Sequence, residues 1–255
     1  KIKKILKKKG KKQIVCLTAY SSTMAKILDK YCDIILVGDS VSMVLYGMKN
    51  TKEIKISTLI LHAESVKKIC KRSLVVFDMP FNTYKNKNIA LKNAKKVMKR
   101  TKCDAVKLEG GKKIINIIKH LVKQNIPVMG HIGLLPQTSK SFKVKGKNKN
   151  QQKKIYQDAL ALSNSGVFSI VIECVIESLA KKITKSISVP TIGIGASRFC
   201  DGQILVTDDI IGMSDFKPRF VKQYSNVRKI IEKSVKNYCT DVIKRKFPTS
   251  KHVYK

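Results

Sequence analysis

Residues 34–39 read Ile34-Ile35-Leu36-Val37-Gly38-Asp39, an unbroken apolar run that ends on a glycine and a carboxylate. Such a run, without alternation of polar and apolar positions, is typical of a strand buried on both faces of a parallel sheet. Similar runs recur at a mean spacing of about 30 residues, the length of one strand with its crossover helix. We therefore predict eight parallel strands, at residues 14–19, 33–38, 74–78, 105–109, 127–131, 169–174, 190–194 and 204–206.

The segments between these strands carry apolar residues at helical spacing, with lysines on the opposite face. A chain of 255 residues with eight strand–helix units fits an α/β fold of one (β/α)8 barrel, the TIM barrel, as a single catalytic domain over 1–255. An open doubly wound sheet is the alternative, but the glycine-rich stretch at 193–198 lacks the third glycine of a dinucleotide fingerprint. The predicted amphipathic helices include 88–101, 113–124, 151–166 and 219–238.

The charge is strongly positive, because 53 Lys and Arg face only 17 Asp and Glu, a net +36. A field of this strength attracts polyanions. The lysines are nevertheless spread over almost every predicted helix, and aromatic residues are not interleaved as a base-stacking surface requires. We interpret the charge as compositional and expect no specific nucleic acid partner.

Other global features restrict where the protein works. No apolar run reaches the ~18–20 residues that span a bilayer, and the first residues lack the apolar core of a signal peptide. The seven cysteines are scattered singly, without the paired spacing of a zinc site or a disulfide framework. We expect a cytoplasmic protein with no membrane contact.

Because acids are scarce, their positions are informative. Asp39, Asp78, Glu109 and Glu173 each end a different predicted strand. In a barrel these strand ends meet at one mouth, where such enzymes place their chemistry. Carboxylates crowded there repel one another, and an all-oxygen set suits Mg²⁺ better than zinc. The alternative is that each acid caps a helix or pairs with a lysine.

Two basic residues lie on the same strands. Lys107 precedes Glu109 by two positions, so both side chains point to one face and the ammonium could hold a substrate carboxylate. His131 follows Val128-Met129-Gly130 at a strand end and could hydrogen-bond a substrate oxygen. Together with the acids, they predict a site for a small anionic substrate.

These residues belong to ordered blocks that closely resemble the ketopantoate hydroxymethyltransferase family, from about residue 18 to beyond residue 206. Any one block alone is weakly specific, but the ordered set is very specific. The blocks include Val37-Gly38-Asp39-Ser40, Asp78-Met79-Pro80-Phe81, Val106-Lys107-Leu108-Glu109-Gly110-Gly111, Gly130-His131-Ile132-Gly133-Leu134-Leu135-Pro136-Gln137, Glu173-Cys174-Val175 and Cys200-Asp201-Gly202-Gln203.

The resemblance implies roles for the matched positions. Glu173 is implied as the general base. The other matched residues are implied to hold Mg²⁺ or the 2-oxo acid. The implied metal set is Asp39, Asp78 and Glu109, direct or through water, and the implied substrate contacts are Asp39, Ser40, Asp78, Lys107 and His131.

The resemblance also implies the reaction and the assembly. A hydroxymethyl group passes from 5,10-methylenetetrahydrofolate to 3-methyl-2-oxobutanoate through a Mg²⁺-stabilised enolate, giving 2-dehydropantoate for pantothenate biosynthesis. Relatives of this family form homo-oligomers, described as decamers. These points come from the resemblance, not from residue spacing.

Two alternatives stay open at this stage. A Mg²⁺-dependent 2-oxo acid lyase or mutase of the isocitrate lyase type would share the enolate chemistry, but its Lys-Lys-Cys-Gly-His loop is missing from the sequence. A basic nucleic-acid-binding protein is the alternative from another class. A salt-sensitive RNA shift without Mg²⁺-dependent turnover would favour it.

Overall fold

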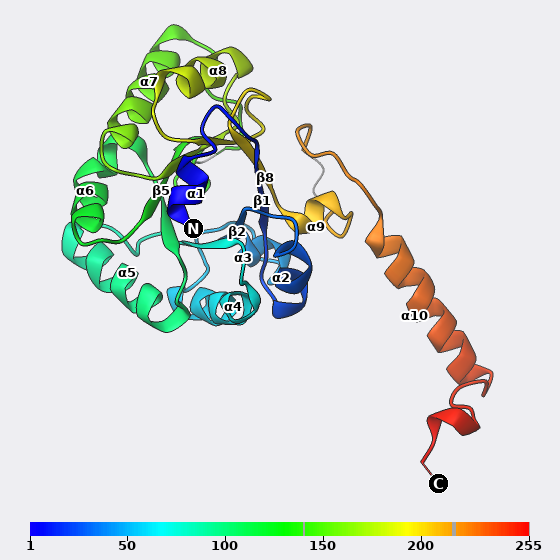
Figure 1. Ribbon diagram of the computed structural model, residues 1–255. Helices are drawn as coiled ribbons and strands as arrows, with labels where there is room; N and C mark the ends of the chain where they lie inside the picture. Colours follow the sequence, from blue (N-terminus) through cyan, green and yellow to red (C-terminus); the bar gives the residue numbers. More distant parts are fainter. Residues whose placement is uncertain (140, 216–217, 255) are drawn as a thin grey trace. The chain divides into compact units, whose positions relative to one another are not determined.

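The computed structural model describes residues 1–139, 141–215 and 218–254, and its sheet is a closed barrel of eight parallel strands (Figure 1). Each strand pairs with the next one along the chain, and β8 closes the barrel on β1. The predicted (β/α)8 fold is confirmed. The strands are β1 Ile14–Thr18, β2 Ile34–Val37, β3 Leu74–Asp78, β4 Ala105–Glu109, β5 Val128–Gly133, β6 Ser169–Glu173, β7 Thr191–Ile194 and β8 Gly202–Leu205.

All eight predicted strands are present, and the largest errors are two residues, at the end of β5 and at the start of β8. The prediction began this strand at residue 204, whereas the structure begins it at Gly202. A side chain at Gly202 would bring its Cβ within 2.4 Å of the carbonyl oxygen of Ile14. The glycine that weakens the strand pattern is therefore what allows β8 to approach β1 and close the barrel.

The unbroken apolar runs divide between two layers of core. On β2 and β3, Ile34 and Leu74 point into the barrel, while Ile35 and Val75 point outward against the helices. Both faces of each strand are thus buried, which explains the absence of polar alternation.

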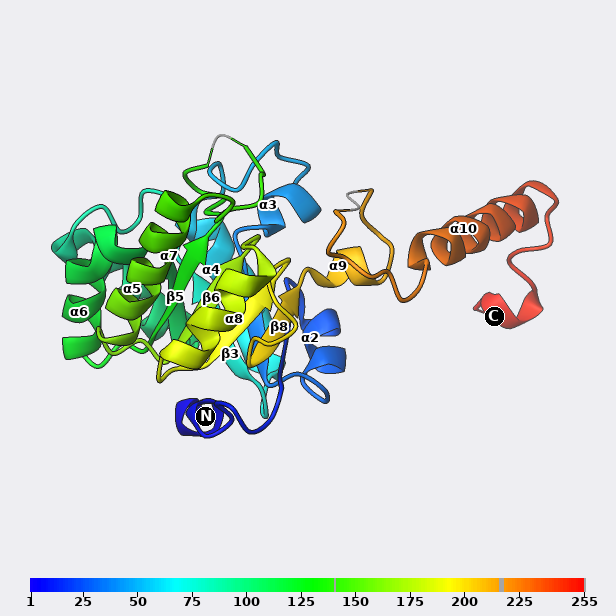
Figure 2. The same cartoon turned by 90° about the horizontal axis from the view of Figure 1, so that it is seen from above.

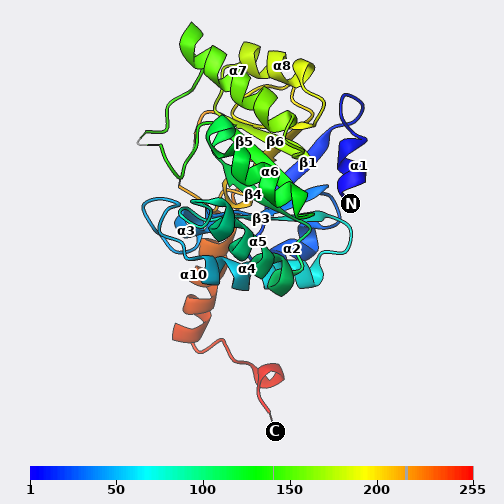
Figure 3. The same ribbon diagram turned by 90° about the vertical axis from the view of Figure 1, so that its left-hand side faces the viewer.

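Helices cover the outside of the barrel (Figures 1 and 3). Asn86 and Asn148 cap α5 and α7 by accepting hydrogen bonds from the backbone N–H groups of Ile89 and Gln151. Both helices therefore begin slightly before their predicted starts. The helices of this unit are α1 Ile2–Leu6, α2 Ser22–Leu28, α3 Val41–Val44, α4 Ile56–Ile69, α5 Lys87–Thr101, the 3₁₀ helix η1 Gly111–Ile114, α6 Ile115–Lys123, α7 Lys149–Ser163 and α8 Glu177–Ser186.

The two ends of the barrel differ. Helix α1 and the segment after it lie at the end where the strands begin, and α3 lies at the opposite end (Figure 2). Ion pairs attach the N-terminal segment, with Lys9 Nζ 2.8 Å from Asp201 and Lys8 bonded to Asp33. This closed end leaves the C-terminal ends of the strands for a site.

Residues Lys1–Val206 form one compact unit and Thr207–Lys255 form a second. The second unit contains α9 Thr207–Ile210, α10 Val227–Ile243 and a 3₁₀ helix at Ser250–His252. The helix predicted at 219–238 is wrong at its start, because α10 begins after Asn226, whose side chain caps it. The single catalytic domain over 1–255 stays a prediction. In the described parts of the chain, no helix is long and apolar enough to cross a membrane.

Candidate active site

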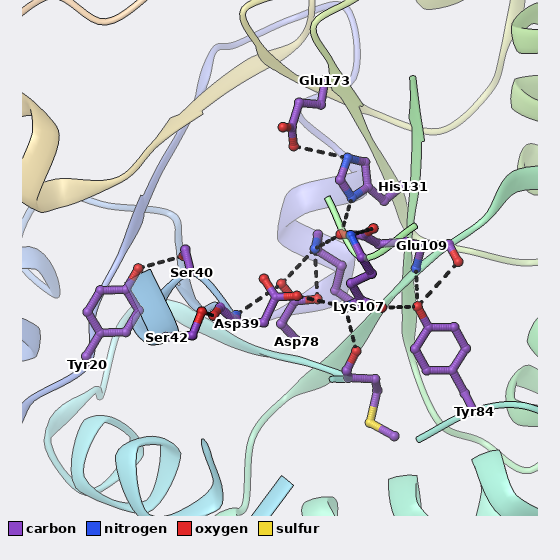
Figure 4. Close-up of polar contacts among 12 residues, drawn as sticks. Tyr20, Asp39, Ser40, Ser42, Asp78, Tyr84, Lys107, Glu109, His131 and Glu173 are labelled. Atoms are coloured by element: carbon purple, nitrogen blue, oxygen red, sulfur yellow. Dashed lines mark hydrogen bonds and ion pairs between the residues drawn. The ribbon is translucent and has the colours of Figure 1, made fainter. Parts of the chain in front are cut away.

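The charged residues predicted at the strand ends lie together at the mouth of the barrel (Figure 4). Lys107 and Glu109 on β4 and His131 on β5 point inward, because they follow the inner-core residues Ala105 and Met129 at intervals of two. The parallel register sets Glu109 beside His131. Their side chains are at most 5% exposed, and that of Glu173 is 15% exposed. Asp39, directly after β2, and Asp78, at the end of β3, are also buried.

Lys107 is paired with Asp78. Its Nζ lies 2.7 Å from both oxygens of the Asp78 carboxylate and 3.8 Å from Oε1 of Glu109. Burial lowers the pKa of Lys107, but the charges of Asp78, Glu109 and Asp39 outweigh it and raise that pKa above its usual value. Lys107 is therefore an ammonium ion inside the barrel.

His131 lies between two carboxylates. Its Nδ1 is 3.3 Å from Glu109 Oε1, and its Nε2 is 3.3 Å from Glu173 Oε2. Neither contact has the alignment of a good hydrogen bond. Burial and the charge of Lys107 act to lower the pKa of His131, but the charge of Glu109 and the contacts with Glu109 and Glu173 outweigh them and raise it to about 9. An imidazolium ring thus connects the two glutamates.

The cluster at the mouth of the barrel contains more carboxylates than cationic side chains. Burial raises the pKa of Asp39 and of Asp78, and the charge of Glu109 adds to both effects. Burial also acts to raise the pKa of Glu109, but His131 and Lys107 bring it below its usual value. With four carboxylates facing two cations, the ionised cluster carries an excess of two negative charges, which suits a divalent cation.

The donor chemistry fits Mg²⁺, although the oxygens do not converge. Among the described residues, no three His, Cys, Asp or Glu side chains are arranged as a formed metal site. Both oxygens of Asp78 are instead bonded to Lys107. The prediction that an acid pairs with a lysine thus holds for Asp78, and the predicted metal set stays a prediction.

Gln137 and Tyr84, for which the sequence predicts no role, also join the cluster. The Gln137 side chain donates to Asp39 Oδ2 at 2.8 Å and to the Met79 carbonyl at 3.0 Å. Its backbone N–H donates to Glu109 Oε2 at 3.2 Å, and its Oε1 accepts a bond from the Tyr84 hydroxyl. Gln137 ends one of the family-like blocks, but periodicity does not reveal a contact made by a loop residue.

Ser40 lies at the edge of the site. Its hydroxyl is 2.7 Å from that of Tyr20, and the Ser42 hydroxyl donates to the Asp39 carbonyl at 2.8 Å. The Tyr20 carbonyl is 2.7 Å from His62 Nδ1, so His62 supports this edge. These bonds fix the turn that carries Asp39 and Ser40.

Sequence comparison identifies relatives over the whole chain. A family profile described as ketopantoate hydroxymethyltransferase matches residues 1–250. The 3-methyl-2-oxobutanoate hydroxymethyltransferase of Pelagibacter ubique is 56% identical over 254 residues, covering 100% of this chain and 99% of the relative. The enzyme of the same name from Rhizobium etli is 48% identical, covering 97% and 92%.

Solved structures with a similar fold are much more distant in sequence. A phosphonopyruvate hydrolase in complex with oxalate and Mg²⁺ has a TM-score of 0.63 at 9% identity, covering 100% of this chain and 91% of that one. A 2,3-dimethylmalate lyase of the PEP mutase/isocitrate lyase superfamily has a TM-score of 0.62 at 12% identity, covering 80% and 76%. At these identities the likeness concerns the fold alone.

Proposed function

Because this chain belongs to the ketopantoate hydroxymethyltransferase family, we propose that it transfers a hydroxymethyl group from 5,10-methylenetetrahydrofolate to 3-methyl-2-oxobutanoate. The product would be 2-dehydropantoate, used in cytoplasmic pantothenate biosynthesis. The observation that carries the mechanism is the buried cluster in which His131 separates Glu173 from Glu109, Lys107 and Asp78.

The cationic side chains suit binding of the 2-oxo acid. The Lys107 ammonium and the His131 ring supply positive donors in a buried site, where charge-assisted bonds to a carboxylate or keto oxygen are strong. Ser40, held by Tyr20, adds a hydroxyl at the edge. The substrate would thus be fixed with its oxygens toward the β2–β5 side of the mouth.

Asp39, Asp78 and Glu109 would hold Mg²⁺. When bound, the ion supplies Lewis-acid polarisation of the keto group of the substrate. Gln137 orients two of these carboxylates, because it donates to both Asp39 and Glu109.

Glu173 has the position of a general base. It ends β6, which lies opposite β2 in an eight-stranded barrel, and its carboxylate is more exposed than the other members of the cluster. Helix α8 has Ile176 as its N-cap, so Glu173 is not needed there. Glu173 would remove the proton from C3 of the oxo acid. The resulting enolate carbon would form the bond to the methylene carbon of the donor, while the two bonds from that carbon to the folate nitrogens break, water supplies the hydroxyl group and tetrahydrofolate leaves.

Exchange of the C3 hydrogen into D₂O, followed by NMR without folate, tests this assignment. Glu173→Gln keeps the size of the side chain but cannot accept a proton, so we expect exchange to fall about 10²–10⁴-fold. Binding of the oxo acid should change little. Glu177→Gln is the control, since Glu177 lies four residues further on and its side chain is 51% exposed. An exchange rate equal to the wild type in Glu173→Gln would exclude Glu173 as the base.

We also propose a homo-oligomer, with the decamer implied by the family resemblance as its form. No residue of α10 is buried in the single chain, and apolar side chains follow one another along it. A second copy of the chain would cover them, which sedimentation can test. These side chains are Ile230, Ile231, Val235, Tyr238 and Val242, each at least 43% exposed.

A further inference from the structure

A cavity of about 580 Å³ lies beside Glu109. Glu109 lines it, whereas Asp39, Asp78, Lys107, His131 and Glu173 do not. This volume lies in the range of pockets that hold drug-sized ligands. Its walls come from the ends of β4 and β5, from the loops after β3 and β5, from η1 and α6, and from α7. Its apolar and aromatic lining is Phe81, Tyr84, Ile114, Ile117, Ile132, Leu135 and Ile155.

Positive charge gathers around this cavity from four separate segments. Its lining includes Lys85, Lys113, Lys145 and Lys154. Within the described residues, none of these four ammonium groups forms an ion pair. The lining therefore combines an apolar wall with uncompensated cations.

The two acids of the lining, Glu109 and Asp158, offset this charge only in part, because four lysines face them and both acids already have partners. Asp158 Oδ1 accepts a hydrogen bond from the backbone N–H of Lys112 at 2.7 Å. The Glu109 carboxylate faces His131 and accepts the N–H of Gln137. A ligand with an apolar body and several negative charges would suit this lining.

We propose that this cavity binds the reduced folate donor, with its ring system against the apolar wall and its glutamate carboxylates among the lysines. This inference rests on the proposed function. Glu109 is a wall of the cavity and also contacts His131 and Lys107, so a ligand in the cavity lies next to the oxo acid site. The lysines of the lining thus gain a role that the overall composition does not explain.

Charge reversal in matched pairs tests the proposal. The double variant Lys113→Glu/Lys154→Glu changes two lining residues, and Lys112→Glu/Lys153→Glu changes their exposed sequence neighbours, which do not line the cavity. Both variants lose the same net charge, so long-range attraction falls equally. We expect the Kd of 5-formyltetrahydrofolate triglutamate, measured by calorimetry, to rise about tenfold more in the lining variant. Equal Kd values in the two variants would overturn the proposal.

A second pair tests the seat of the ring system. Ile117→Trp adds volume at the cavity wall, whereas Ile115→Trp adds it to a partly buried residue of α6 outside the lining. Binding of the monoglutamate should weaken in Ile117→Trp and be retained in Ile115→Trp. Thermal melts verify that each variant is folded. Loss of binding in both tryptophan variants, with intact melts, would contradict the assignment of this wall.

The wild-type protein separates a failure of this inference from a failure of the proposed function. If it neither exchanges the C3 hydrogen of 3-methyl-2-oxobutanoate nor forms 2-dehydropantoate, the proposed function is wrong and the folate assignment falls with it. If it performs both reactions and the cavity variants bind folate like their controls, only the cavity assignment is wrong.

Discussion

Replacing Gln137 by methionine tests whether this loop residue positions the metal carboxylates. Methionine has a similar length and volume but cannot make the bonds to Asp39, to the Met79 carbonyl and to Tyr84. Gln137 is 1% exposed, so water does not readily replace these partners. The substitution should therefore affect both folding and the metal site.

The magnitude follows from the groups left behind. A buried polar group that loses its partner costs about 1–3 kcal/mol, and three are affected here. Because such losses are not additive, we expect the free energy of unfolding to fall by about 3–5 kcal/mol. Loss of a residue that orients metal ligands typically weakens metal binding about 10–100-fold.

Two measurements separate these effects. Urea titration gives the stability, and electron paramagnetic resonance of Mn²⁺ gives the metal affinity without requiring turnover. Gln157→Met is the control, because Gln157 is exposed on α7 and should change neither value. A destabilised Gln137→Met protein that binds Mn²⁺ as tightly as the wild type would show that Gln137 supports the fold but does not orient the metal ligands.

Three further changes test other parts of the reasoning. Asp78→Asn should abolish Mg²⁺ binding and turnover, and full turnover would contradict this. It should also lower the melting temperature, because the buried Lys107 ammonium loses its carboxylate partner at 2.7 Å and is left with Glu109 at 3.8 Å. Burial acts to raise the pKa of Asp29, but bonds from the N–H groups of Lys71, Arg72 and Ser73 lower it to about 2. The stabilisation of the fold by the Asp29 carboxylate is therefore complete above pH about 4 and is lost as the pH falls toward 2. The urea midpoint of Asp29→Asn should thus decline less than that of the wild type over that range. RNA binding should be weak and fall steeply with salt, and tight sequence-selective binding at physiological salt would refute a purely compositional charge.

The fold was predictable because most strands are buried on both sides; β1 and β8, with the exposed Val15 and Gln203, are the exceptions. The residues of β2 and the first four residues of β3 are all apolar and buried, so hydrophobicity alone predicts these two strands. The prediction is weakest for β8, where the exposed Gln203 interrupts the pattern. A strand buried on two faces appears in the sequence as a short apolar run, which can be recognised without knowing which distant residues it contacts.

The parts that failed depend on distant partners. The apolar spacing around Tyr224 predicts a helix, but its backbone N–H donates to the Ile210 carbonyl, and that of Val227 donates to Ile211. These bonds to the end of α9 satisfy N–H groups that a continuous helix would otherwise use. Gln137 is a similar case, because its contacts depend on where the loop after β5 places it.

The position of an acid relative to its strand separates the acids paired at the closed end of the barrel from the acids of the proposed active site. Asp33, Asp104 and Asp201 precede β2, β4 and β8, and each meets a lysine at the closed end of the barrel, where charge is locally balanced. At the other end, the ion pairs of the described residues place only Lys107 and His131 beside the four carboxylates. This is so although the protein has a net charge of +36. Composition cannot produce this local excess of negative charge, since lysine is abundant everywhere else. The divalent cation proposed above would balance this charge, and the cluster's own carboxylates support that proposal separately from the family.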